Sequence, residues 1–173
     1  GGGVDSYISF PTIVNNTIVR NCLQGGGSAC SAGGGGISFT DSGVVEMANN
    51  VVAWNAAATG GGGLDLANST INFVSNDAWG NSPENYYPTR DDPTGSSGNV
   101  SLDPLFVSEQ ASRRSYQPRS DSPLLDTGSD PLSPLTDIRG VTRPLDGDGD
   151  GVAMPDIGAR ENEGATRLLF TSN

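Results

Sequence analysis

The sequence predicts an all-β protein: a right-handed parallel β-helix, or solenoid, of about three coils, followed by an irregular C-terminal cap rich in Pro, Asp and Gly. Three observations support this prediction. Clusters of Gly recur in the first half of the chain, a pair of Asn follows each cluster at a nearly constant distance, and apolar residues alternate between them. With 25 Gly and 11 Pro among 173 residues, the composition also favours tight turns over long helices.

The Gly clusters set the period of the first half. They lie at residues 1–3, 33–36 and 60–63, and the first Asn of each pair follows 13 or 14 residues after the last Gly. The two Asn are five residues apart, and the pairs are Asn16/Asn21, Asn50/Asn55 and Asn76/Asn81. Gly and Asn both tolerate the left-handed backbone that a sharp corner between strands requires. We therefore expect the repeated Asn to occupy corners of the coils.

Apolar residues keep the same register in each repeat when the repeats are aligned on the first Asn. The residues three before and two after that Asn are Ile13, Met47 and Phe73, and Ile18, Val52 and Ala78. Alternation with a period of two is typical of short strands with one inward face, and equivalent strands of successive repeats then pair as parallel sheets. We assign residues 1–81 to the β-helix coils.

The chain's only two cysteines flank the one long insertion in this repeat. Cys22 and Cys30 lie directly after Asn21, where the first coil is longer than the others. In a secreted chain this spacing favours a disulfide that closes a surface loop, and closing so short a loop contributes about 2 to 3 kcal/mol to stability. Two unrelated thiols in a reducing compartment are the alternative.

The second half of the chain, residues 82–164, has a different composition. Pro, Asp and Ser replace the Gly clusters, which is typical of turns and loops. Its motifs, in order, are LDPLF at 102–106, SPLLDTG at 122–128, TDIRG at 136–140, RP at 143–144, DGDGDG at 146–151 and PDIGARE at 155–161. Residues 165–173 indicate the start of a further strand or tail.

This succession of motifs resembles the C-terminal portion of secreted bacterial right-handed β-helix proteins of the pectate-lyase-like superfamily, in the group called choice-of-anchor Q proteins. The chain departs from the family pattern at residues 124–128 and at Arg160, where the family usually has an aromatic residue. The resemblance implies an extracellular or cell-surface location. It does not select a function, because the family includes adhesins, surface proteins and some polysaccharide-active enzymes. A cap at this end would cover the open sheet edge in which a solenoid ends.

The DGDGDG motif predicts a calcium site. Asp146, Asp148 and Asp150 alternate with Gly, and Gly151 stands at the sixth position, as in an EF-hand loop. The twelfth position lacks the usual Glu, whereas Asp156 falls at the eleventh. We predict that these four aspartates hold a structural Ca²⁺, and a solvated acidic turn without metal is the alternative.

Composition excludes several classes of function. The chain has no Lys and no His, so triads that use His and His-ligated zinc sites are excluded within this chain. A formal net charge of −11 argues against a nucleic-acid partner. No apolar run reaches the roughly 18 to 20 residues of a membrane-spanning helix, so we expect no membrane span.

A polysaccharide lyase of this superfamily would need acidic calcium ligands and a basic residue on one exposed sheet face. Only Asp5 and Asp65 among the coil acids occupy equivalent positions, Ser38 lies between them, and Arg20 is the only coil Arg. We therefore identify no catalytic residues in this segment.

We expect an extracellular or cell-surface protein with a structural or adhesive role, as part of a larger assembly or filament. The alternative is a carbohydrate-active enzyme, a lyase or a glycosidase, or a polysaccharide-binding module, with its active face in coils outside this segment. Self-association is a further expectation. An end coil leaves Val4, Ile8 and Ile13 facing open space until another coil or a neighbouring subunit covers them.

Overall fold

The structure is a computed structural model that describes residues 2–22, 30, 33–108 and 115–164. Within these residues the protein is all-β with three parallel sheets, and it contains no α-helix. Its short 3-10 turn, η1, covers Thr89–Asp91. No helix in the described ranges has the length and apolar character that a membrane crossing needs. Residues 165–173, for which the sequence indicates a further strand or tail, lie outside the described residues.

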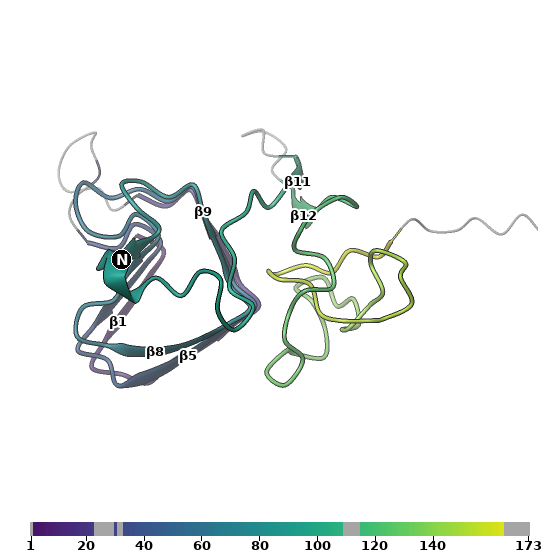
Figure 1. Cartoon of the computed structure of the whole chain (residues 1–173), viewed down its shortest axis with the longest axis horizontal. Coiled ribbons are helices and arrows are strands. Elements are labelled where there is room, and N and C mark those ends of the chain that lie inside the picture. Colours follow the sequence, from purple (N-terminus) through teal and green to yellow (C-terminus); the bar gives the residue numbers. More distant parts are fainter. Residues whose placement is uncertain (1, 23–29, 31–32, 109–114, 165–173) are drawn as a thin grey trace, which may run out of the picture.

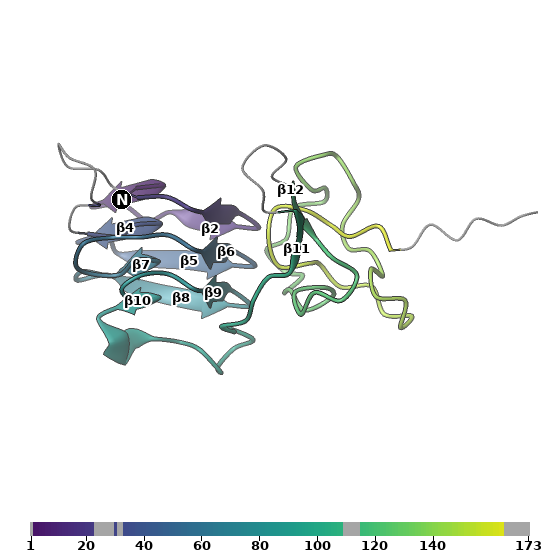
Figure 2. The same ribbon diagram turned by 90° about the horizontal axis from the view of Figure 1, so that it is seen from above.

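Each parallel sheet takes one strand from each successive repeat, and the chain visits the three sheets in the same order each time. The first sheet has the order β1-β4-β7-β10 (Val4–Tyr7, Ile37–Thr40, Leu64–Asp65, Tyr86–Tyr87). The second is β2-β5-β8 (Thr12–Val14, Val44–Ala48, Thr70–Val74), and the third is β3-β6-β9 (Thr17–Val19, Val51–Ala53, Asp77–Trp79). Figure 1 shows the sheets around a common interior, and Figure 2 shows the strands of each sheet one above another.

Register within the sheets aligns the apolar positions of successive repeats, as the alternating pattern predicts. The aligned sets are Ile13, Met47 and Phe73 in the second sheet and Ile18, Val52 and Ala78 in the third. These side chains form one apolar cluster with Ile37, Phe39 and Leu64 of the first sheet, which are at most 1% exposed. The three sheets therefore share a single interior, and burial of apolar surface there holds them together.

The corners between strands differ from the expectation in one respect. The residues with positive φ are Asn15, Asn49 and Ser75 at the first Asn-bearing corner and Arg20, Trp54 and Gly80 at the second. The repeated Asn come directly after these residues and have no positive φ themselves. The prediction that the repeated Asn supply the left-handed backbone is therefore wrong. Their side chains instead form hydrogen bonds between repeats.

The repeated Asn form two rows of side-chain hydrogen bonds that pass from one repeat to the next. In the first row, Asn16 Nδ2 donates to Asn50 Oδ1 (3.2 Å), Asn50 Nδ2 to Asn76 Oδ1 (2.9 Å) and Asn76 Nδ2 to Asn99 Oδ1 (3.1 Å). Each of these oxygens also accepts the backbone N–H of the Asn before it in the row, at 2.9 to 3.0 Å. The second row has the same pattern and runs through Asn21, Asn55, Asn81 and Asn85.

The side-chain amides also bind carbonyl groups of the preceding repeat. Asn50 Nδ2 donates to the carbonyl of Ile13 (2.7 Å), and Asn55 Nδ2 donates to that of Ile18 (2.9 Å). Asn50 and Asn55 are at most 1% exposed, so the groups they bind have little access to water. A buried backbone group without a partner is costly, and each internal Asn satisfies backbone groups of its neighbours at the corner.

Residues 83–101 cover part of the far end of the three sheets. β10 pairs with β7 of the first sheet, and Val100 forms a parallel bridge with Asp77 of β9. The first part of the predicted cap region, 82–164, therefore pairs with the ends of the first and third sheets, whereas β8 is the edge strand of the second.

The remaining part, residues 104–108 and 115–164, packs beside the sheets and does not cover their ends (Figure 2). We call it the C-terminal lobe; it contains one antiparallel pair, β11 (Phe106–Ser108) and β12 (Ser115–Pro118). The apolar cluster between lobe and third sheet contains Val51, Ala53, Phe106, Leu124 and Ile157. The lobe thus buries the outer face of a sheet whose inner face already belongs to the core.

The Asn rows give a stability prediction. Replacement of Asn50 by Ala removes both donors of its amide and the oxygen that Asn16 binds, and leaves the buried Ile13 carbonyl without that partner. We expect Asn50→Ala to lower the free energy of unfolding by about 2 to 4 kcal/mol in urea denaturation. The matched control is Asn72→Ala, because Asn72 is exposed and makes one surface bond, to Glu46. Its cost is expected to stay within about 0.5 kcal/mol, and equal effects of the two variants would contradict the prediction.

Candidate functional site

The acidic motif forms a surface loop on the C-terminal lobe. Its two ends are held together by an antiparallel bridge between Leu145 and Met154. Gly149 and Gly151 have φ of 82° and 95°, a region that favours Gly, which explains why Gly alternates with Asp here. Asp146 accepts the N–H groups of both glycines, at 2.7 and 3.0 Å. The loop therefore has defined hydrogen bonds of its own.

Three carboxylates converge at this loop, and one of them comes from a distant part of the sequence. Oxygens of Asp126, Asp146 and Asp148 lie within 4.8 Å of one another, close enough to share one cation. Asp126 Oδ2 accepts the N–H groups of Gly147 and Asp148, both at 2.9 Å, which fixes the loop beside it. Asp126 is half-buried, whereas Asp146 and Asp148 are exposed.

The other two predicted ligands lie outside this group. Asp150 accepts the N–H of Val152 and stays exposed at the tip of the loop. Asp156 is 1% exposed, and its oxygens accept the N–H groups of Asp126 (3.0 Å) and Asn162 (2.6 Å). Burial raises the pKa of the Asp156 carboxyl to about 7. Asp156 therefore organises the backbone behind the acidic group.

A buried ion pair organises the rest of the lobe. Arg143 and Glu161 are 3.0 Å apart, with side chains at most 1% exposed. Arg143 also donates to the carbonyls of Asp156 (3.2 Å) and Gly158 (2.9 Å), and Glu161 accepts the N–H groups of Asp156 (3.0 Å) and Leu145 (3.3 Å). The RP and PDIGARE motifs thus meet in one buried network inside the lobe.

The same PDIGARE segment attaches the lobe to the corners of the repeats. Asn15 Nδ2 donates to the carbonyls of Asp156 (3.1 Å) and Gly158 (3.2 Å), and the Gly158 N–H donates to the carbonyl of Asn49 (2.8 Å). The N–H of Ala159 donates to Thr17 Oγ1 (3.0 Å). Gly158 has a φ of 112°, which a residue with a side chain rarely adopts.

The outer face of the first sheet carries no continuous row of acids in the described chain. Asp5, Ser38 and Asp65 pair in register, so Ser38 separates the two carboxylates as the sequence predicts. Arg20 lies elsewhere, at a corner of the third sheet, with its guanidinium 4.9 Å from the centre of the Trp54 ring. Trp54 in turn packs edge-on against Phe106, with ring centroids 5.9 Å apart. This Trp therefore belongs to the junction with the lobe.

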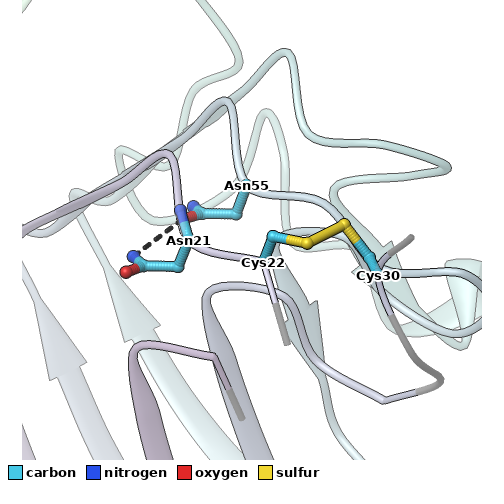
Figure 3. The surroundings of a disulfide bond; sticks show 4 residues. All are labelled: Asn21, Cys22, Cys30 and Asn55. Carbon is cyan, nitrogen blue, oxygen red and sulfur yellow. Dashed lines mark hydrogen bonds between the residues drawn. A yellow bond between two sulfur atoms is a disulfide. The ribbon is translucent and has the colours of Figure 1, made fainter. Parts of the chain in front are cut away.

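The predicted disulfide is confirmed: Cys22 and Cys30 are bonded, with Cα atoms 5.4 Å apart. Figure 3 shows the bond beside the second Asn row, where Cys22 directly follows Asn21. Cys22 also forms a parallel bridge with Ala56 of the next repeat. The disulfide therefore closes its loop at a point where the backbone is already held.

Asp77 is a buried acid without a charged partner in hydrogen-bond contact. It is 0% exposed; Oδ1 accepts the N–H of Leu102 (3.0 Å), and Oδ2 has no hydrogen-bond partner among the described residues. Burial, with a smaller contribution from nearby Asp103, raises the pKa of Asp77 to about 7. Asp77 lies in β9, but Leu102, whose N–H it binds, lies where the chain leaves the sheets for the lobe. Asp77 therefore makes the stability of this junction depend on pH.

Sequence reasoning missed Asp126 as a member of the acidic group and Asp77 as a buried acid. Asp126 follows the buried Leu124 and Leu125, some twenty residues before the loop that it contacts. Nothing in the spacing joins the two segments, because their approach depends on the fold of the lobe. Asp77 directly follows a repeated Asn, a position that Val51 occupies in the preceding repeat. An Asp at a position where the preceding repeat has Val could have indicated a buried acid from the sequence.

Comparisons with known proteins identify no relative: no family model, no curated protein and no solved structure matches this chain. The resemblance to choice-of-anchor Q proteins therefore rests on the motifs themselves.

Asp77 gives a prediction for pH dependence. Its folded pKa of about 7 lies above the unfolded value of 3.8, so between about pH 4 and 7 the folded state keeps a proton that the unfolded chain releases. The free energy of unfolding should therefore fall as the pH rises through this window, and Asp156 acts in the same direction. Asp77→Asn should flatten this fall by an amount on the order of 2 kcal/mol, measured by urea denaturation at several pH values. The exposed Asp130→Asn is the control, and an unchanged slope in Asp77→Asn would refute the assignment.

Proposed function

We propose that this chain is a structural segment of an extracellular or cell-surface protein, made of about three coils of a right-handed parallel β-helix and a lobe packed on their side. The observation that carries the proposal is the continuity of the two Asn rows through successive repeats. Rows of this kind join one repeat rigidly to the next. A rigid rod with a folded lobe suits the role of a spacer or a scaffold in a larger assembly.

The β-helix proposal is supported by the strand order. The chain enters the three sheets in the same sequence in each repeat, and every neighbour within them is parallel and in register. The right hand is inferred from the general rule that crossover connections between parallel strands of one sheet are right-handed in about 98% of cases.

The location outside the cell is supported by the Cys22–Cys30 disulfide, because such bonds persist in oxidising compartments and are rare in the cytosol. The motifs of the second half support it as well, through their resemblance to secreted proteins. The separation of Asp5 from Asp65 and the packing of Arg20 over Trp54 favour a non-catalytic role over a lyase.

A cleavage assay distinguishes the two functions. We expect the chain to release no unsaturated uronate from polygalacturonate or alginate in calcium buffer, followed by ultraviolet absorbance. Sedimentation with the same polymers would detect binding without cleavage, which would favour a polysaccharide-binding module. Cleavage that disappears in Arg20→Ala would contradict the structural proposal and would show that the chain is a polysaccharide lyase.

We propose further that the group formed by Asp126, Asp146 and Asp148 binds Ca²⁺ and stabilises the lobe. Three carboxylates this close repel one another unless a cation neutralises them, and oxygen donors are the ligands that Ca²⁺ prefers. The acidic turn without metal remains the alternative outcome of the test below.

Calcium at about 1 mM, within the range in which extracellular modules bind it, should raise the melting temperature by about 3 °C or more relative to chelator. Asp148→Ala should abolish this shift. Asp150→Ala is the matched control: it lies in the same loop but outside the carboxylate group, so its shift should persist. If calcium does not shift the melting temperature of the unmodified chain, or if both variants lose the shift equally, the loop is an acidic turn without metal.

A further inference from the structure

The N-terminal face is formed by the free edges of β1, β2 and β3, and it differs from the opposite end of the sheets in how many strands lack a partner. Each of these strands has one neighbour in its sheet, and that neighbour lies in the next repeat. At the opposite end, β7 and β9 have partners within residues 83–101. β8 has no further strand beside it in the described chain, so the opposite end is covered at the first and third sheets, whereas the N-terminal face is open at all three.

The two Asn rows begin at this face with Asn16 and Asn21. Asn50 and Asn55 Oδ1 each accept a backbone N–H and a side-chain amide from the repeat before. No described residue donates to Asn16 Oδ1 or to Asn21 Oδ1. Figure 3 shows the Asn21 oxygen turned away from Asn55. Asn16 is exposed and Asn21 is half-buried, whereas Asn50 and Asn55 are buried.

The apolar interior also continues to this face. Ile13 and Ile18 are each 9% exposed, and Val4 is half-buried, although their partners in the next repeat are at most 1% exposed. A pocket of about 300 Å³ opens here, and its lining includes Val4, Ile18, Asn21 and Tyr116 of the lobe. The face therefore offers apolar surface and two fixed hydrogen-bond acceptors together.

We propose that the N-terminal face docks one further repeat of the same kind, a parallel three-strand unit that carries two Asn five residues apart. Each incoming Asn would donate its backbone N–H and its side-chain amide to the side-chain oxygen of Asn16 or Asn21, as each Asn of one repeat does to the next. Its apolar residues would cover Val4, Ile13 and Ile18. This inference rests on the proposed structural function, but its test below uses no activity, so the two can fail separately.

A second copy of this chain does not offer the required groups. At the opposite end of the rows, Asn99 Nδ2 already donates to the carbonyls of Ser96 (2.8 Å) and Phe73 (3.1 Å), and Asn85 Nδ2 donates to Ser101 Oγ (3.1 Å). The backbone N–H of Asn99 donates to Ser96 as well (2.9 Å), so Asn99 has no donor left for an incoming oxygen, whereas Asn85 keeps one amide N–H. Head-to-tail stacking would therefore continue at most one of the two rows. Face-to-face pairing would place acceptor oxygens against acceptor oxygens.

The test adds one repeat to the N-terminus of the full chain. A copy of residues 34–60 placed directly before Gly1 keeps the register, because the copied Asn50 then precedes Asn16 by 26 residues, the separation between Asn50 and Asn76. We expect the amides of β1, β2 and β3 to exchange with deuterium at least about tenfold more slowly than in the unmodified chain. The control fusion carries Asn50→Asp and Asn55→Asp in the added copy only, which removes the two amide donors, and it should lose most of this protection.

Unchanged exchange of β4 to β9 will show that both fusions fold. If they do not fold, the same repeat supplied as a synthetic peptide at rising concentration should slow exchange of β1 to β3, and its Asp version should not. Equal protection by the Asn and Asp versions, or no protection by either, would overturn the proposal. Protection in the unmodified chain that grows with its own concentration would overturn it in favour of a second copy.

Discussion

Buried backbone N–H and C=O groups must find hydrogen-bond partners, and at the Asn-bearing corners the backbone supplies only some of them. The Asn15 N–H still pairs with the Ala48 carbonyl of the next repeat. The N–H of each row Asn and the carbonyl three residues before it pair instead with the side chain of the next Asn in the row. The side chain of Asn50 accepts the N–H of Asn16 and donates to the Ile13 carbonyl and to Asn76 Oδ1. Asn55 makes the equivalent three bonds at the next corner. A slip of one residue between repeats would break every one of these bonds, so the rows also fix the register in which the apolar residues align.

The lobe depends on the same corners. Asn15 and Asn49 precede the row residues, have left-handed backbone and turn their side chains outward, where Asn15 binds the Asp156 carbonyl and Asn49 binds Ser129. The buried pair of Arg143 and Glu161 then holds the segment that they contact. Breaking a buried ion pair on one side is strongly destabilising, so this network is intolerant of change. Of the two neighbouring residues at one corner, Asn49 thus binds the lobe and Asn50 binds the adjacent repeats.

The sequence predicted the all-β class, the parallel alignment of Met47 between Ile13 and Phe73, and the disulfide, because each depends on a short repeat or on a unique pair of residues. It predicted the importance of the repeated Asn but gave the wrong reason, since Asn favours both left-handed backbone and side-chain rows. The place of the lobe beside the sheets and the approach of Asp126 to Asp146 could not be predicted. Both depend on contacts between segments with no shared period, and no local pattern encodes them.

The claim that the Asn rows act as a continuous unit is tested most directly by a double-mutant cycle on Asn50 and Asn76, whose amide and oxygen bond at 2.9 Å. The free energy of unfolding would be measured for both single Ala variants and for the double variant. Because the first replacement already removes a bond that the second residue makes, the double variant should lose less than the sum, by about 1 kcal/mol or more. Additive losses, within about 0.3 kcal/mol, would show that each Asn acts alone and would contradict a continuous row.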